Sequence, residues 1–164
     1  MQHNILITSA GKRVALTRYF KETLNRFYPD AKVFTTDMNP DMAPAGYVSD
    51  GCFKVPKVTD KDYPALLLEI CEKNEVGMVI ATIDTELLLL ADLKADFARK
   101  GILVMVSDRQ FVEMCRDKRN TGAFFCAARH TRAEGGGQIP SDFSFVRQAL
   151  RWFAEYQSAL HQNG

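Results

Sequence analysis

A short apolar run that leads into an amphipathic segment constrains the fold of this chain most strongly. Residues 5–8 form the run, a turn of small residues and two cations follows at Ser9–Arg13, and Val14–Phe27 has helical periodicity. This order predicts a buried strand that leads into a helix N-terminus, where α/β proteins commonly bind ligands. The expected apolar face of the helix consists of Leu16, Phe20, Leu24 and Phe27.

The same alternation of strand and helix signals continues to about residue 125. Further strands are expected at 32–36, 52–55, 77–82 and 102–106, and further helices at about 60–71, 85–99 and 108–125. Alternation without hairpin signals predicts an α/β, Rossmann-like three-layer domain whose parallel sheet has four to five strands. The loops expected along one edge of the sheet are Ser9–Arg13, Asp37–Gly46, Ile83–Glu86 and Ser107–Arg109.

The character of the chain changes after about residue 120. All ten lysines lie at or before Lys118. After it, arginine replaces lysine as the basic residue. We therefore expect a Rossmann-like domain over 1–125 and an atypical tail over 126–164. Within the tail, Phe143–Leu160 has near-helical apolar spacing and predicts one amphipathic helix whose apolar face needs a cover.

Composition and charge exclude several classes of function. The formal net charge of this 164-residue chain is +1, so neither a nucleic acid nor an acidic membrane is an expected partner. The four cysteines form no Cys-x-x-Cys pair and are interpreted as reduced thiols. No signal peptide or membrane span is recognisable, so we expect a cytoplasmic protein.

The turn after the first strand is the first candidate binding site. Ser9, Gly11, Lys12 and Arg13 combine free backbone N–H groups at a helix start with two cations, an arrangement that favours an anion. The Gly-x-Gly-x-x-Gly and Walker patterns are both absent. The alternative, a tight turn with solvated cations, has about equal weight on these residues alone.

Three acids follow strands and are candidates for substrate contact. Asp37 could meet a ribose hydroxyl, but a turn into Asn39-Pro40 is the favoured interpretation. Asp84 and Glu86 could bind a cationic or hydroxylated substrate, or they could cap the helix that they open.

Lys118 could reach a phosphate, although on its own it is better explained as an exposed helix cation. The three histidines have no metal-ligand spacing, and no nucleophile–base pair can be nominated. Neither a catalytic residue nor a metal ligand is therefore predicted.

Five segments taken together resemble a known family. They are residues 5–13, 36–40, 43–45, 79–87 and 115–121. In order and spacing over about 125 residues, they are similar to the N-terminal domain of ATP-grasp enzymes of the carbamoyl-phosphate-synthase large-chain-like group.

The resemblance implies a carboxylate–amine ligase that uses ATP and magnesium to form an acyl-phosphate. It implies that Lys118, within an Asp-Lys-x-x-Thr match, reaches toward the nucleotide, and that the strand-end loops with Asp84 and Glu86 face a small-molecule acceptor substrate. The family's ATP-clamping lobes and their metal ligands have no match in the 39 residues after Phe125. We therefore expect a truncated domain, not catalytic alone, that depends on a separate ATP-grasp chain or on self-association.

Two other functions remain open at this stage. One is a stand-alone module that binds a nucleotide or small anion at Ser9–Arg13, and the other is an interaction protein that docks through Phe143–Leu160. The tail itself is hypothesised to come from a shifted reading frame or a truncated relic. Translating the DNA past codon 120 in all forward frames tests this, because a frameshift requires ATP-grasp lobes in another frame.

Overall fold

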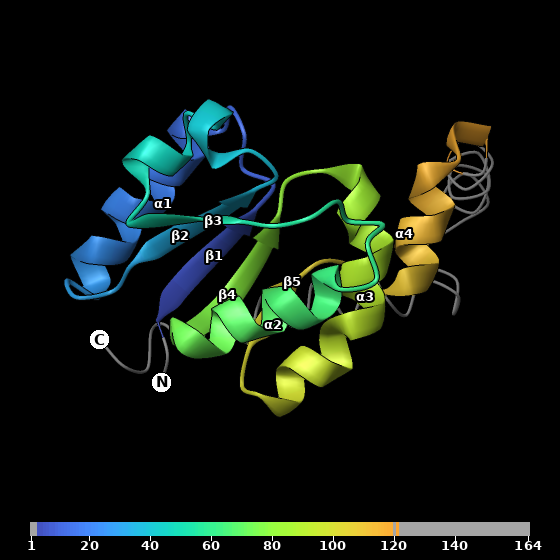
Figure 1. The fold of residues 1–164 in the computed structure, drawn as a ribbon. Helices are drawn as coiled ribbons and strands as arrows, with labels where there is room; N and C mark the ends of the chain where they lie inside the picture. The colour runs from blue at the N-terminus through green and yellow to red at the C-terminus, as the bar shows by residue number, and fades with distance from the viewer. Residues whose placement is uncertain (1–2, 120, 122–164) are drawn as a thin grey trace, which may run out of the picture. The chain divides into compact units, whose positions relative to one another are not determined.

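A computed structural model describes residues 3–119 and residue 121, and the chain divides into two compact units, Met1–Val106 and Ser107–Gly164. The first unit is built on a five-stranded sheet in the order β3-β2-β1-β4-β5 (Figure 1). Its strands are β1 (Asn4–Thr8), β2 (Val33–Asp37), β3 (Gly51–Lys54), β4 (Val76–Ala81) and β5 (Leu103–Met105). Every neighbouring pair is parallel, which confirms the predicted Rossmann-like α/β class.

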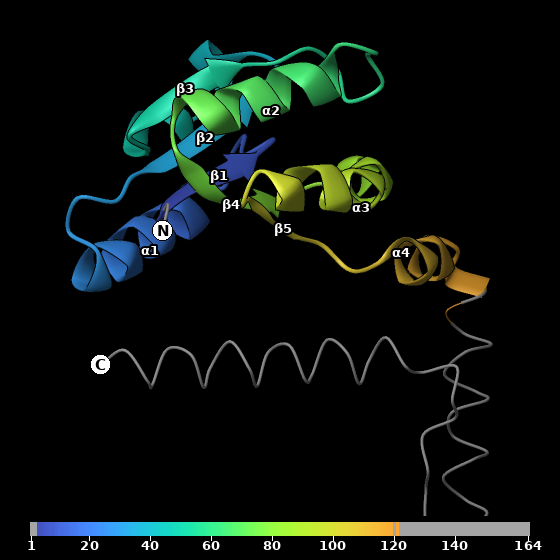
Figure 2. The same cartoon turned by 90° about the horizontal axis from the view of Figure 1, so that it is seen from below.

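Helices cover both faces of this sheet (Figure 2). Helix α1 (Val14–Phe27) lies on one face, and α2 (Tyr63–Lys73) and α3 (Asp84–Arg99) lie on the other. The short 3-10 turns η1 (Pro40–Met42) and η2 (Gly46–Val48) follow β2. The three predicted layers are therefore present.

Two apolar clusters form the core, one on each face of the sheet. The larger cluster packs α2 and α3 against the sheet and includes Leu6, Leu67 and Leu90, all fully buried. The smaller cluster lies under α1 and includes Ile7 and Val33. Strands that contribute apolar side chains to both faces explain the uninterrupted apolar runs in the sequence.

The predicted apolar face of α1 is only half confirmed. Phe20 and Leu24 pack on the smaller cluster, whereas Leu16 is 36% and Phe27 is 72% exposed. Leu16 and Phe27 are therefore not part of the face that α1 packs on the sheet.

The second helix begins later than its sequence signals suggested. It starts at Tyr63, with Asp62 at the N-cap, and not near residue 60. The Asp60 carboxylate instead accepts the backbone N–H of Asp62 at 2.9 Å, which forms a turn before the helix.

In the second unit, α4 (Arg109–Arg116) is shorter than the predicted helix over 108–125. Asp108 caps its N-terminus by accepting the Phe111 N–H at 3.0 Å. The helix stops because Asp117 adopts an extended backbone conformation. Its carboxylate accepts the N–H of Arg119, and helical structure resumes at Lys118 and Arg119. The predicted tail helix over 143–160 lies outside the described residues.

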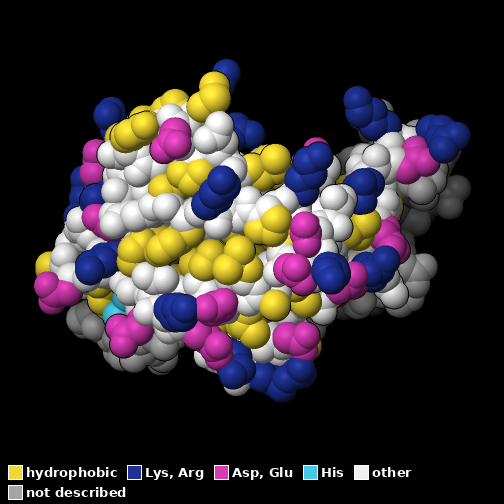
Figure 3. Space-filling view, in the orientation of Figure 1, with side chains coloured by type: hydrophobic (Ala, Val, Ile, Leu, Met, Phe, Trp, Pro, Cys, Tyr) yellow, Lys and Arg dark blue, Asp and Glu magenta, His cyan; other side chains and the backbone are white. Residues whose placement is uncertain are grey.

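Positive and negative side chains are mixed on the surface, as the net charge of +1 suggests. Figure 3 shows lysines and arginines interspersed with aspartates and glutamates over the face that it presents. None of the described helices combines the length and apolar character that a membrane crossing requires.

Candidate functional site at the carboxyl ends of the strands

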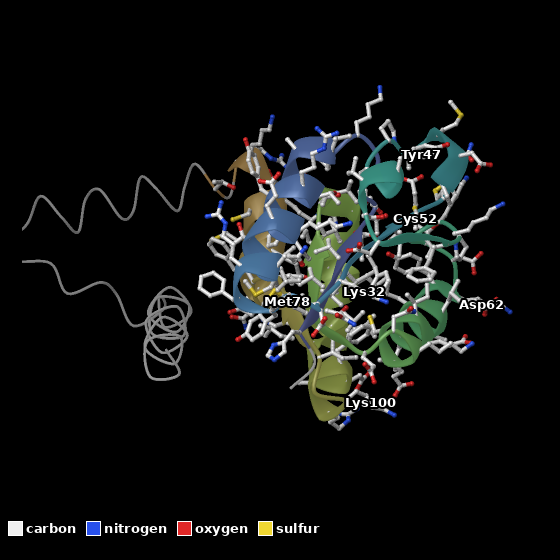
Figure 4. The ribbon with its side chains drawn as sticks, turned by 90° about the vertical axis from the view of Figure 1, so that its left-hand side faces the viewer. Lys32, Tyr47, Cys52, Asp62, Met78 and Lys100 are labelled. Atoms are coloured by element: carbon white, nitrogen blue, oxygen red, sulfur yellow. The ribbon has the colours of Figure 1, made fainter. Side chains whose placement is uncertain are left out.

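Parallel strands bring the turns after β1, β2 and β4 to one edge of the sheet. The predicted loops Ser9–Arg13, Asp37–Gly46 and Ile83–Glu86 follow these strands, so they share this edge. Tyr47, in the loop after β2, and Lys100, which precedes β5, lie at opposite ends of the view in Figure 4. We call the three loops the strand-end turns.

The turn after β1 has an unusual backbone. Both Ser9 (φ 48°) and Gly11 (φ 47°) lie in the left-handed region, which is unfavourable for a residue with a side chain. The hydroxyl of Thr82 donates to the carbonyl oxygens of Thr8 and Ser9 at 2.9 and 2.8 Å, and Ala10 N–H donates to Thr36 O at 3.1 Å. Bonds from two neighbouring strands therefore hold the strained turn in place.

Asp37 serves the turns as the favoured interpretation predicted. Its carboxylate accepts the Gly11 N–H at 3.1 Å and the Asn39 N–H at 2.9 Å. The Gly11 carbonyl in turn accepts the N–H of Ala45 at 3.0 Å. Asp37 thus links the turn after β1 to the loop after β2.

Glu86 is fully buried in the first turn of α3. Its carboxylate accepts three hydroxyl groups: Thr8 Oγ1 at 2.5 Å, Ser9 Oγ at 2.7 Å and the Tyr63 hydroxyl at 2.5 Å. Burial, followed by the charge and hydrogen bond of Glu86, raises the pKa of Tyr63 well above its ordinary value, so the phenol stays protonated. These four residues, Thr8, Ser9, Tyr63 and Glu86, form what we call the hydroxyl cluster.

Sequence reasoning missed Thr8 and Tyr63 as members of this site. The helical spacing of Tyr63 indicates only an apolar helix face, and Thr8 ends the expected first strand, directly before the turn that could hold an anion. A signal did exist, because a tyrosine on a buried face usually needs a partner for its hydroxyl. The position of that partner depends on how α2 and α3 pack, which no local pattern reveals.

The charged candidates at this edge are exposed. Lys12 and Arg13 precede the first residue of α1, and Asp84 is the first residue of α3. The only hydrogen bond among their side chains and the turns runs from Arg13 Nη2 to Thr82 O at 3.5 Å, as far as the described residues show. These three side chains can therefore meet a ligand from solvent.

Lys118 belongs to the second unit and is exposed. It is helical and follows the break at Asp117, so it is an exposed helix cation but not part of one continuous helix with α4. Among residues 3–119 and 121, no group of three or more His, Cys, Asp or Glu side chains could hold a metal ion.

Comparison with known proteins places this fold among larger enzymes. Residues 5–105 match the model of the family described as "PylC-like, N-terminal domain". Solved structures with a similar fold include the biotin carboxylase domain of a single-chain bacterial carboxylase, at TM-score 0.52 and 16% identity over 74% of this chain and 28% of that chain. The biotin carboxylase subunit of pyruvate carboxylase matches at TM-score 0.52 and 12% identity, over 74% of this chain and 26% of its own.

A single-chain, multi-domain long-chain acyl-CoA carboxylase matches at TM-score 0.51 and 16% identity, over 83% of this chain and 13% of its own. The chain thus corresponds to less than a third of each of these structures. Among curated proteins, none matches this sequence.

Proposed function

Because the chain belongs to the PylC-like N-terminal domain family and has the fold of the N-terminal domain of ATP-grasp ligases, we propose that it provides the substrate side of a carboxylate–amine ligation. We assign the reaction to the carbamoyl-phosphate-synthase large-chain-like kind, on the segments that carry that resemblance. One observation supports this most: side-chain hydrogen bonds join the turns after β1, β2 and β4 into one polar surface at the edge where such sheets bind ligands.

Within this proposal the strand-end residues have different tasks. Lys12, Arg13 and Asp84 are exposed and contact the substrate. Gly11 and Asp37 give the edge its shape, because their hydrogen bond joins two turns. Glu86 is buried, so it acts on Ser9 and does not itself touch the substrate.

The chain does not catalyse the ligation alone in this proposal. It covers 28% or less of the length of the similar carboxylase structures. Lys118 approaches the nucleotide, while the other ATP contacts and the magnesium ligands come from outside the described residues, from a separate ATP-grasp chain or from an assembly with a further copy. When bound, ATP would supply the phosphoryl group that turns the substrate carboxylate into an acyl-phosphate, with release of ADP.

Nuclear magnetic resonance titration of the full chain tests substrate binding. We expect small carboxylates and amines to shift the amide signals of residues 9–13 and 82–86, and Lys12→Ala to weaken the carboxylate response several-fold. Lys100→Ala is the matched control, because this exposed lysine lies between α3 and the start of β5, at the opposite edge of the sheet from the strand-end turns. Figure 4 labels Lys100. Equal weakening by both variants, or no shift at these turns, contradicts the proposed site.

An assay of ADP formation tests the claim that catalysis needs more than this chain. The full chain with ATP, magnesium and the same carboxylates and amines should release no ADP above the rate without protein. Steady ADP formation that disappears in Lys118→Ala would show that the chain is an enzyme by itself.

A further inference from the structure

We propose that Ser9 meets its ligand only as a hydrogen-bond acceptor, and that Glu86 and Tyr63 are positioning residues that impose this polarity. Ser9 therefore selects a ligand group that donates, such as an ammonium, amide N–H or hydroxyl, against a carboxylate or phosphate oxygen. The inference rests on the proposed function, because it concerns the ligand of the same strand-end turns.

The argument begins with the single proton of the Ser9 hydroxyl. Ser9 Oγ donates to Glu86 Oε1 at 2.7 Å, where the carboxylate oxygen is the acceptor. The Ser9 proton is therefore committed to Glu86. Because Ser9 is only partly buried, the lone pairs of Oγ are what remains for a ligand.

Two further hydroxyl donors hold the Glu86 carboxylate in place, so it stays the acceptor of the Ser9 proton. Tyr63 donates to the same oxygen at 2.5 Å and Thr8 donates to the other at 2.5 Å. Glu86 and Tyr63 are both fully buried, so water does not replace these partners. The raised pKa of Tyr63 keeps its phenol a donor throughout the neutral range.

The backbone of Ser9 offers no donor either. Its N–H donates to Thr36 Oγ1 at 3.3 Å, and its carbonyl oxygen accepts the Thr82 hydroxyl at 2.8 Å. A ligand oxyanion would therefore find neither an O–H nor an N–H at Ser9. Oxyanions have better partners in the exposed Lys12 and Arg13, which carry full positive charge.

The first readout needs no ligand. We expect the Ser9 hydroxyl proton to exchange slowly with solvent, measured on the full chain from the deuterium isotope shift of the Ser9 Cβ resonance. Glu86→Gln should accelerate the exchange, because an amide group can donate to Ser9 and release its proton. A Ser9 hydroxyl that exchanges as fast as that of a free serine overturns the proposal.

The second readout compares methylammonium and acetate as probes. Methylammonium should shift the Ser9 signals and acetate should not, and Ser9→Ala should remove the methylammonium response. Glu86→Gln should reverse the preference, so that the acetate response at Ser9 exceeds that of methylammonium. Thr59→Ala, at an exposed threonine outside the strand-end turns, is the control that should keep the original preference.

Tyr63→Phe is the second variant, in case Glu86→Gln does not fold. Removing this donor loosens Glu86, so we expect faster Ser9 hydroxyl exchange and a methylammonium response reduced several-fold, with the acetate response at Lys12 and Arg13 unchanged. Acetate shifting Ser9 as strongly as methylammonium in the unmodified chain overturns the proposal but leaves the proposed function intact. No response to either probe anywhere in the strand-end turns overturns both.

Discussion

The Asp37 carboxylate accepts the backbone N–H of Gly11 at 3.1 Å, across 26 residues of sequence. This bond joins the ends of β1 and β2 and leaves Gly11 in the left-handed region. We expect Asp37→Ala to lower the free energy of unfolding by about 1–3 kcal/mol, because two backbone N–H groups lose their acceptor. Urea unfolding measures this. Asp62→Ala is the control, since the Asp62 side chain caps no N–H, and an equal loss there would contradict the argument.

Gly46→Ala should be destabilising for a steric reason. An added Cβ would lie 2.9 Å from both the Cβ and the Sγ of Cys52 on β3, which is closer than such atoms approach. Overpacking of this kind costs about 1–3 kcal/mol. Thermal unfolding should show partial recovery when Cys52→Ala is added, because the sulfur is removed but the Cβ remains. No recovery would show that another contact causes the loss.

Substitutions within the hydroxyl cluster should have non-additive effects on the free energy of unfolding. Glu86→Ala leaves the buried Tyr63 hydroxyl without its acceptor, so the double variant with Tyr63→Phe should be less destabilised than the sum of the two single variants. A double-mutant cycle should give a coupling energy of about 0.5–3 kcal/mol. Additive losses would mean that the 2.5 Å hydrogen bond contributes nothing specific.

Tyr63 also predicts how stability depends on alkaline pH. Its pKa is raised in the folded state, so the folded protein holds this proton more tightly than the unfolded chain does. The contribution is complete below the ordinary pKa of about 10 and is lost as pH rises above it. Tyr63→Phe should therefore show a shallower fall in the free energy of unfolding between about pH 10 and 12. An unchanged slope would contradict this assignment.

Cys71 should resist modification in the folded protein. Burial, with a smaller effect from Glu72, raises the pKa of its thiol to about 12, whereas Cys115 is exposed. A thiol reagent at neutral pH should therefore label Cys115 quickly and Cys71 only as the protein unfolds. Mass spectrometry of timed samples, with a urea-unfolded control, measures both rates. Equal rates in the native protein would contradict the burial of Cys71.

Much of the fold could be predicted because its signals are local. Continuous apolar runs identify β1 and β4, and helical spacing places Tyr63, Leu67 and Cys71 on one buried face of α2. The end of α4 could not be predicted in the same way. Asp117 can continue a helix or cap the next turn, and its competing hydrogen bond to Arg119 decides which.

At the site, too, local sequence signals predict some features and only tertiary packing decides others. The sequence by itself determined the order of strands and helices, and therefore that Ser9, Asp37 and Glu86 lie at one edge of a parallel sheet. Only the tertiary structure decided that Glu86 is buried beneath the hydroxyls of Thr8, Ser9 and Tyr63. Periodicity is a property of neighbouring residues, whereas the partners of a buried carboxylate come from segments up to 78 residues away and are chosen by packing.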